Sequence, residues 1–331
     1  MAIKWGILST ADINRKVLAG AAESDDVEVV AVGSRDLAGA EEFAQQWEIP
    51  RAYGTYDELL ADSEVEAVYI PLPNTMHVEW SIRALEAGKH VLCEKPFSRH
   101  VDDVERAFAA AEATGKVLSE AFMYRYHPQT ARLVELVRSG AIGELRVIRS
   151  TFSYSLYDTA NIRLRTDAEG GSLMDVGCYC VSGARLLAGE PESVAATAYT
   201  GPSGTDWVFT GMLRFAGGVV ALFDCGTSLP ERDELEAVGT EGTLFLDDPW
   251  HCDDPVIELR RTVVGEDGED TIEVEMIDVE LANPYRLELE AMNATIRGEA
   301  GAALGREDAI GQVRAIDALF RAAASGETVA L

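Results

Sequence analysis

Residues 89–96 read KHVLCEKP, and this stretch decides the fold. The apolar run from His90 to Cys93 predicts a buried strand, and a helical pattern closed by Gly88 precedes it. A strand that follows a helix and ends in a polar tripeptide is typical of a parallel α/β sheet. Ligands of such sheets bind outside the carboxyl ends of the strands. Lys95 is therefore expected at a binding crevice, although a solvated loop start is the alternative.

The same alternation of strand and helix covers the first 120 residues. The expected strands are Ile3–Leu8, Val27–Val32, a brief one before Tyr53, Ala67–Ile70, His90–Cys93 and Val117–Glu120. The expected helices are Asp12–Ala22, Leu37–Trp47, a short one within Tyr53–Ala61, Thr75–Ala87 and Val101–Thr114. Right-handed crossovers between such units build a doubly wound Rossmann domain, which we assign to residues 1–122.

The pattern changes after a predicted helix from Gln129 to Ser139. The expected strands are Leu145–Tyr157, Ser193–Tyr199, Trp207–Phe215, Val219–Cys225, Leu235–Val238, Thr243–Leu246, Val256–Val263 and Thr271–Met276. The other expected helices are Ser172–Leu187, Pro284–Arg297 and Arg306–Ala324. Alternating polar and apolar strands predict an open-faced, mainly antiparallel β-sheet in residues 123–331. We expect the acidic stretch Glu266–Glu280 to be a solvated hairpin, and the C-terminal helix to be able to pack back on the first domain.

Composition excludes several classes of protein. The 331 residues suggest two domains, and no apolar run approaches the length that spans a bilayer. The formal net charge of −29 makes nucleic acid and anionic membranes unsuitable partners. The five cysteines lack metal-ligand spacing, so we expect reduced thiols, no metal and a cytoplasmic location.

The first strand-to-helix turn runs from Gly6 to Asn14. The glycines of a dinucleotide fingerprint are replaced here by Ser9, Ala11 and Asn14. Small residues still allow close backbone approach, and hydroxyls can donate to a pyrophosphate at the helix N-terminus. The residues assigned to the cofactor from this turn are Ser9, Thr10, Ala11 and Ile13. An ordinary turn, with Thr10 or Asp12 as the N-cap, is the alternative.

The second strand ends at Ser34-Arg35-Asp36. An NAD-binding domain usually has a carboxylate at this tip to hold the ribose 2′-hydroxyl. The hydroxyl of Ser34 and the guanidinium of Arg35 suit a 2′-phosphate instead. We therefore expect NADP rather than NAD, with Asp36 starting the next helix.

Polar residues follow the fourth and fifth strands as well. We assign to the cofactor the strand-end residues Pro71, Leu72, Asn74, His77, Glu94 and Lys95. For Asn74 the alternative is a helix N-cap, and for His77 it is a histidine packed against its own helix.

Two later segments carry residues suited to a substrate pocket. Tyr124, Arg125 and His127 can line a sugar site by stacking and hydrogen bonds, or they can simply fill space. Asp175 and Tyr179 follow a Gly-Gly turn and are four residues apart, which puts both on one helix face. An acid and a phenol at one cleft are suited to proton transfer. The alternative is that Tyr179 packs in the core and Asp175 satisfies a buried donor.

These segments together resemble the Gfo/Idh/MocA oxidoreductases. The likeness rests on the Glu94-Lys95-Pro96 tripeptide, on Pro73-Asn74 with His77, and on the Gly-rich segment that carries Asp175 and Tyr179. Within the family, residues 120–129, 161–163 and 174–180 are most similar to the NADP-dependent D-xylose 1-dehydrogenase and dimeric dihydrodiol dehydrogenase branch. The resemblance implies that Lys95 lies beside the nicotinamide ribose and that Arg163, Asp175 and Tyr179 face the substrate. It also implies a homodimer or homotetramer formed through the C-terminal sheet.

The expected reaction is hydride transfer from C1 of an aldose, with D-xylose as first choice, to NADP⁺. Tyr179 would take the proton from the C1 hydroxyl, Lys95 would favour the phenolate, and Asp175 would orient the substrate or keep Lys95 charged. The alternatives are a trans-dihydrodiol dehydrogenase, a dicarbonyl-sugar reductase and a non-catalytic NADP-binding regulator.

Overall fold

The computed structural model describes residues 1–158, 160–264, 270–302 and 304–331. The chain forms two compact units, each described here by itself. The first consists of Met1–Met123 with Asn283–Ile310, and the second of Tyr124–Ala282 with Gly311–Leu331. The predicted fold class, a Rossmann sheet plus a mainly antiparallel sheet, is confirmed.

In the described part of the first unit, six parallel strands form a sheet in the order β3-β2-β1-β4-β5-β6. The strands are β1 Ile3–Leu8, β2 Val27–Gly33, β3 Arg51–Tyr53, β4 Ala67–Ile70, β5 His90–Glu94 and β6 Leu118–Ala121. The helices are α1 Asn14–Ala22, α2 Leu37–Gln46, α3 Tyr56–Leu60, α4 Asn74–Glu86, α5 Val101–Thr114 and α8 Pro284–Ile296. The strand order reverses between β1 and β4, which is where doubly wound sheets bind ligands.

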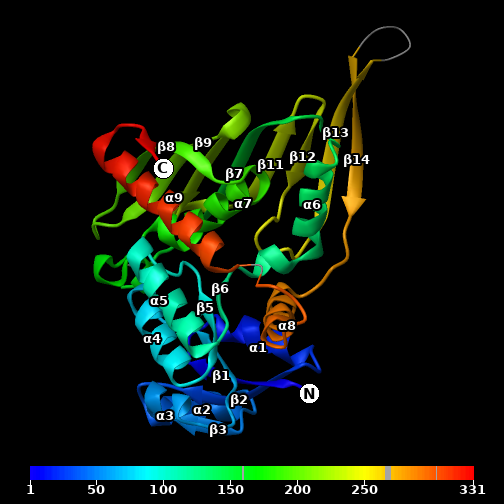
Figure 1. Cartoon of the computed structure of the whole chain (residues 1–331). Coiled ribbons are helices and arrows are strands. Elements are labelled where there is room, and N and C mark those ends of the chain that lie inside the picture. Colours follow the sequence, from blue (N-terminus) through cyan, green and yellow to red (C-terminus); the bar gives the residue numbers. More distant parts are fainter. Residues whose placement is uncertain (159, 265–269, 303) are drawn as a thin grey trace. The chain divides into compact units, whose positions relative to one another are not determined.

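Helices cover both faces of this sheet. α4 packs with α5 on one face, and α1 packs with α8 on the other (Figure 1). Every residue of β4 is buried, because a parallel strand between two helical layers has no solvent side. This explains why these strands are continuous apolar runs in the sequence.

Helix α8, which we assigned to the second domain, belongs to the first unit. Gly20 of α1 makes the close approach possible, since a Cβ there would lie 2.6 Å from the backbone nitrogen of Arg286. The buried side chain of Asn293 accepts a hydrogen bond from Trp5 Nε1 at 3.1 Å and donates one to the carbonyl of Asp26 at 2.7 Å. The sequence predicts a helix here, but the partners that hold it lie more than 260 residues away in the chain.

In the described part of the second unit, nine strands form a sheet in the order β14-β13-β12-β11-β7-β10-β9-β8-β15. The strands are β7 Leu145–Ser155, β8 Pro191–Thr200, β9 Asp206–Phe215, β10 Val220–Gly226, β11 Ser228–Gly239, β12 Gly242–Leu246, β13 Val256–Val264, β14 Asp270–Asp278 and β15 Val329–Ala330. The longer helices are α6 Pro128–Arg138 and α7 Cys178–Ala188, together with α9 Arg306–Ser325, which belongs to this unit from Gly311 on. The short turns are η1 Met123–Tyr126, η2 Ile162–Leu164, η3 Thr166–Ala168, the π-helix η4 Leu173–Gly177 and η5 Ala216–Gly218. β7 and β10 run parallel, and the other described neighbours run antiparallel.

One face of this sheet is open, as the alternating pattern predicts. Leu222 of β10 is 42% exposed, and Ile272, Val274 and Met276 of β14 are more exposed still. β13 and β14 form a hairpin at the edge of the sheet (Figure 1). Of the predicted acidic hairpin, residues 266–269 lie outside the described residues, and residues 271–276 of β14 are exposed.

All five cysteines lie within the described residues and are buried free thiols, so the expectation of reduced cysteines is confirmed. Burial raises the pKa of the Cys93 and Cys225 thiols well above the ordinary value, which keeps them protonated. Among the described helices, none combines the length and the apolar character needed to cross a bilayer.

Replacing Asn293 with leucine should destabilise the protein. The change leaves the indole N–H of buried Trp5 without its partner and removes one of the two hydrogen bonds that the carbonyl of Asp26 accepts, the other coming from the N–H of Ile3. We expect the free energy of unfolding to fall by about 2–4 kcal/mol, measured by urea denaturation. The control is Gln45→Leu on the exposed side of α2. Equal effects of the two changes would contradict this role of Asn293.

Candidate active site

The turn after β1 has the backbone geometry of a glycine fingerprint without its glycines. Ser9 has a φ of 125°, a conformation that favours glycine, and its hydroxyl donates to the carbonyl of Pro71 at 3.3 Å. Ile13 is the N-cap of α1, and within the described residues its side chain makes no capping bond. Thr10 and Asp12 are therefore not the caps, and the helix N-terminus stays suited to an anion such as phosphate.

Asn14 stabilises this turn, a role that the fingerprint comparison did not reveal. Its side chain is fully buried, and Nδ2 donates to the carbonyl of Ser9 at 2.8 Å. Among the described residues Asn14 Oδ1 has no hydrogen-bond partner. An asparagine at the third fingerprint position thus holds Ser9 in its unusual conformation. Ala11, whose N–H donates to the hydroxyl of Ser9 at 3.3 Å, completes the turn.

The tip of β2 presents a cation rather than a carboxylate. Ser34 is half-buried, and its N–H donates to the carbonyl of Tyr53 at 3.0 Å. Arg35 is exposed and interacts with Tyr56. Burial raises the pKa of Tyr56, and the charge of Arg35 opposes that rise. Asp36 caps α2 by accepting from the N–H of Gly39 at 3.1 Å, as the sequence predicts. This arrangement fits a 2′-phosphate.

Both ring nitrogens of His77, which we assigned to the cofactor, contact backbone carbonyls. Its ring is buried, with Nε2 2.7 Å from the carbonyl of Leu72 and Nδ1 2.9 Å from that of Pro96. Burial lowers the pKa of His77 to about 4, although the hydrogen bonds to the two carbonyls act in the opposite direction. His77 therefore ties together the loops that follow β4 and β5. Asn74 is the first residue of α4 and is half-buried, while Pro73 occupies the N-cap.

Glu94 and Lys95 leave the end of β5 in a fixed arrangement. The hydroxyl of buried Tyr69 donates to Glu94 Oε1 at 2.5 Å, and burial raises the pKa of that tyrosine well above its ordinary value. Lys95 is half-buried, and its charge helps to lower the pKa of His77. The N–H of Phe97 donates to Glu120 Oε1 at 2.8 Å. Tyr69 and Glu120 thus hold the segment on both sides of Lys95.

In the second unit, Asp175 lies in the π-helix before α7. Gly171 allows this turn to approach Asp206, because a Cβ on Gly171 would lie 2.0 Å from Asp206 Oδ1. Asp206 accepts from the hydroxyl of Ser172 at 2.9 Å and from the N–H of Leu173 at 2.7 Å. Hydrogen bonds of a π-helix join residues five apart, so four residues complete less than one turn. We expected Asp175 and Tyr179 to share one helix face because they are four residues apart. That expectation assumes α-helical spacing, which does not apply to Asp175 in the π-helix.

The carboxylate of Asp175 is held by two side chains. Tyr154 donates to Oδ2 at 2.5 Å, and Arg163 Nε donates to Oδ1 at 3.1 Å. Burial and the carboxylate both raise the pKa of Tyr154, so its proton stays on the hydroxyl. Arg163, predicted as a substrate residue, thus positions Asp175.

Tyr179, the second residue of α7, is 5% exposed and lies among aromatic rings. Its ring centroid is 5.3 Å from that of Phe152, 5.8 Å from Tyr124 and 6.0 Å from Trp250. We call Tyr124, Phe152, Tyr179 and Trp250 the aromatic cluster. The ring of Tyr179 is thus packed in the core, which was the alternative that we gave for this residue from the sequence. A phenolate in such surroundings needs a nearby cation.

The segment from Tyr124 to His127 is attached to its own unit. Ser182 of α7 accepts from the hydroxyl of Tyr124 at 2.7 Å and from Arg125 Nη1 at 3.1 Å. His127 is fully buried; its Nδ1 accepts from the N–H of Gln129, and its Nε2 lies 3.1 Å from the carbonyl of Ala282. Both ring nitrogens thus contact backbone groups, and His127 caps α6.

Two family profiles match the chain. Residues 3–122 match the Gfo/Idh/MocA profile described as an oxidoreductase family with an NAD-binding Rossmann fold, and residues 130–245 match the GFO/IDH/MocA C-terminal domain. The chain is 39% identical to the D-xylose 1-dehydrogenase (NADP(+)) 2 of Haloferax volcanii over 99% of both chains. It is 36% identical to the trans-1,2-dihydrobenzene-1,2-diol dehydrogenase of Mus musculus over 79% of each.

Two solved structures are also similar. A 3-ketoreductase from Actinomadura kijaniata, in complex with NADP and TDP-benzene, matches with a TM-score of 0.89 and 29% identity, over 97% of this chain and 98% of that one. An aldose-aldose oxidoreductase from Caulobacter crescentus, complexed with glycerol, matches with a TM-score of 0.90 and 26% identity over the whole of both chains.

The buried ring of His77 should make stability depend on pH. The unfolded chain binds a proton with a pKa near 6.5, whereas the folded protein does so only near 4. The contribution of His77 is therefore complete above pH 6.5 and falls as pH drops toward 4, by about 3 kcal/mol in the free energy of unfolding. We expect urea denaturation at pH 7, 5.5 and 4.5 to show a weaker pH dependence for His77→Gln than for the wild type. His100→Gln, on the surface, is the control; an unchanged slope in His77→Gln would contradict the prediction.

Proposed function

Because the chain belongs to the Gfo/Idh/MocA family of oxidoreductases, we propose that it oxidises the C1 hydroxyl of an aldose to an aldonolactone, with D-xylose as the first choice. The observation that carries this is the 39% identity, over 99% of both chains, to a D-xylose 1-dehydrogenase. The cofactor is NADP, in agreement with that relative and with the cation at the tip of β2.

The residues that would hold NADP fit its chemistry. The uncapped N-terminus of α1 suits the pyrophosphate, and Ser34 with Arg35 suits the 2′-phosphate. Asn74 and Glu94 are half-buried at the ends of β4 and β5, where the nicotinamide half of the cofactor is expected. When bound, NADP⁺ supplies the hydride acceptor.

Tyr179 is the proposed proton acceptor. A tyrosine has an ordinary pKa of about 10, and an apolar environment raises it further because it disfavours the phenolate. A cation must therefore favour the ionised form, and Lys95 is the proposed one. Asp175, held by Tyr154 and Arg163, would orient the sugar by accepting a hydrogen bond from a hydroxyl.

A trans-dihydrodiol dehydrogenase is the second candidate function. The 36% identity to the mouse dihydrobenzenediol dehydrogenase and the aromatic cluster around Tyr179 favour it, since aromatic rings stack on a flat substrate. A dicarbonyl-sugar reductase is a further alternative, and an NADP-binding regulator belongs to another class. NADPH absorbance at 340 nm with a panel of aldoses and trans-diols discriminates them. Tight binding of NADP without turnover of any substrate would favour the regulator.

The quaternary structure and the location stay predictions. We propose a homodimer or homotetramer formed through the open face of the second sheet. Apolar side chains are exposed there, namely those of Leu222, Ile272, Val274 and Met276. Self-association would remove that apolar surface from water. The expected location is the cytoplasm.

Replacing Tyr179 with phenylalanine should abolish most catalysis. The ring keeps its aromatic neighbours, but the proton acceptor is lost, so we expect kcat to fall at least about 100-fold. The Kd for NADP⁺, measured by fluorescence titration, should not change. Lys95→Ala should reduce both kcat and the affinity for the cofactor. Tyr157→Phe, at a position 90% exposed, is the control; near wild-type kcat in Tyr179→Phe would reject Tyr179 as the proton acceptor.

Arg35 should determine the choice between NADP and NAD. Removing its guanidinium in Arg35→Ala should lower kcat/KM for NADP⁺ by about 10- to 100-fold, the range expected for a charged hydrogen bond. The kcat/KM for NAD⁺ should stay the same, because that cofactor lacks the 2′-phosphate. Arg106→Ala, on the surface of α5, is the control. Equal kcat/KM values for the two cofactors in the wild-type enzyme would overturn the assignment.

A further inference from the structure

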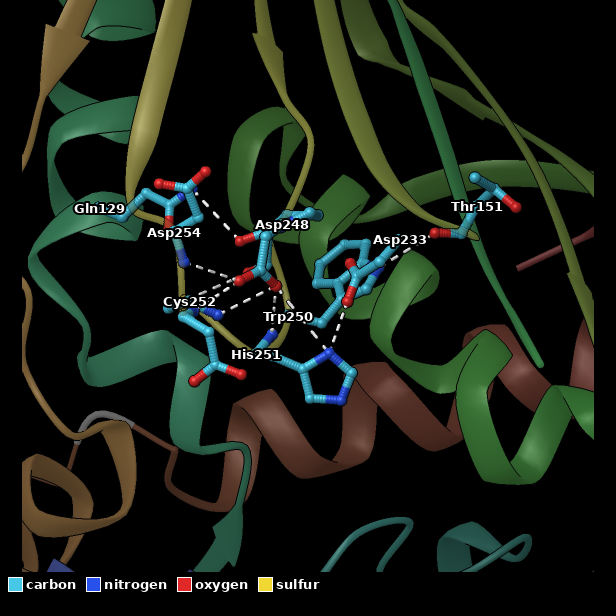
Figure 2. A network of polar contacts seen from close by, with 10 residues as sticks. Gln129, Thr151, Asp233, Asp248, Trp250, His251, Cys252 and Asp254 are labelled. Atoms are coloured by element: carbon cyan, nitrogen blue, oxygen red, sulfur yellow. Dashed lines mark hydrogen bonds and ion pairs between the residues drawn. The ribbon is translucent and has the colours of Figure 1, made fainter. Parts of the chain in front are cut away.

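The turn that follows β12 is rigid. The carboxylate of Asp248 accepts hydrogen bonds from four backbone N–H groups, at 3.2 Å from His251 and Cys252, 2.5 Å from Asp253 and 3.0 Å from Asp254 (Figure 2). Four donors on one carboxylate hold the segment in a single conformation. The side chains that this turn carries therefore extend from a backbone that four hydrogen bonds hold in place.

The turn brings Trp250 and His251 to the aromatic cluster. Trp250 is fully buried, donates from Nε1 to the carbonyl of Thr151 at 3.1 Å, and contacts Tyr179. The ring of His251 lies edge-on to Phe152, with centroids 5.4 Å apart, and Phe152 contacts Tyr179. His251 thus stands at the border of the cluster that surrounds the proposed proton acceptor.

Asp233 orients the ring of His251. The Oδ2 atom of Asp233 lies 2.7 Å from His251 Nδ1, and the aspartate side chain is only 14% exposed, against 33% for the histidine. Burial raises the pKa of Asp233 to about 6, and the hydrogen bond from His251 opposes that rise. In the neutral imidazole, a carboxylate on Nδ1 favours the tautomer in which Nδ1 carries the proton and Nε2 is an acceptor. In Figure 2 the second ring nitrogen points away from Asp233 and from the strands.

The same residues do not make a good metal site. Ligand atoms of Asp233, Asp248 and His251 lie within 4.8 Å of one another. However, a carboxylate offers about four lone-pair positions, and the N–H groups of the turn occupy those of Asp248. Without Asp248, only Asp233 and His251 are left, and Asp233 orients the His251 ring so that its Nε2 can act as a hydrogen-bond acceptor.

We propose that His251 contacts the substrate by accepting a hydrogen bond from a sugar hydroxyl at Nε2, with Asp233 as the residue that positions its ring. The inference rests on the proposed function and deepens it, because it names a residue that selects for polyhydroxylated substrates. A site built to pair with a hydroxyl strongly rejects analogues that lack it. An aromatic diol has no hydroxyl beyond those of the reacting pair, so His251 favours aldoses over such diols.

Three variants test this role. His251→Phe keeps an aromatic ring against Phe152 and removes the acceptor, whereas His251→Gln keeps an acceptor near the position of Nε2. Asp233→Asn presents an amide to the ring, which reverses the tautomer. Asp254→Asn is the matched control, because it removes an exposed carboxylate of the same turn and leaves the hydrogen bond from its backbone N–H in place.

The expected result is a selective change in KM. In His251→Phe the KM for D-xylose should rise at least tenfold while kcat changes less than threefold, and the KM for trans-dihydrobenzenediol should stay constant. Asp233→Asn should show a smaller rise, and His251→Gln should recover part of the loss. An unchanged KM for the aldose in His251→Phe, or an equal rise for the diol, would overturn the inference.

A second measurement separates this inference from the proposed function. If the wild-type enzyme oxidises no aldose, the proposed function fails, but binding can still be read as the shift in Tm that xylitol produces in the presence of NADP⁺. A shift in the wild type that is lost in His251→Phe and kept in Asp254→Asn supports the contact. The same shift in the wild type and in His251→Phe, or no shift in the wild type, refutes it.

Discussion

The common edge at which parallel strands end is the constraint on which the first unit depends. Because β1, β2, β4 and β5 are parallel, the residues that follow them meet at one edge of the sheet. The backbone groups of these loops must still find partners, and buried side chains supply them. His77 contacts the carbonyls of Leu72 and Pro96, Asn14 bonds that of Ser9, and Glu120 accepts from Phe97. The loops can therefore be open to a ligand and still be rigid.

In the second unit, irregular backbone is held by the carboxylates of buried Asp206 and half-buried Asp248. Asp206 accepts from Ser172 and Leu173 and so supports the π-helix, while Asp248 holds the turn that carries Trp250 and His251. In both cases a charged side chain replaces the regular hydrogen bonds that an irregular backbone lacks. Irregular segments, rather than ideal helices and strands, thus carry Asp175 and His251, the proposed substrate contacts of this unit.

The aromatic cluster makes the proposed proton acceptor, Tyr179, depend on a nearby cation. The apolar rings around Tyr179 disfavour its charged form, so the phenolate forms only where a cation compensates. The polar groups at the border of the cluster would contact the substrate. Asp175 and His251 each have their orientation fixed by other side chains, Tyr154 and Arg163 in one case and Asp233 in the other. Such fixed groups lose little freedom when they bind a ligand.

The sequence by itself determined the fold class, the strands of both sheets except β15, and the chemistry at the tip of β2. These follow from local periodicity and from residue type, because short apolar runs such as Ala67–Ile70, alternating with helical patterns, are typical of buried parallel strands. Only the tertiary structure decided that α8 belongs with α1, that the rings of His77 and His127 contact backbone groups, and that Tyr154 and Asp233 hold other side chains. Those facts depend on contacts between residues far apart in the chain, such as Asp233 with His251 and Trp5 with Asn293, which no local pattern encodes. The π-helix under Asp175 is of the same kind, because Asp206, more than 30 residues away, stabilises it.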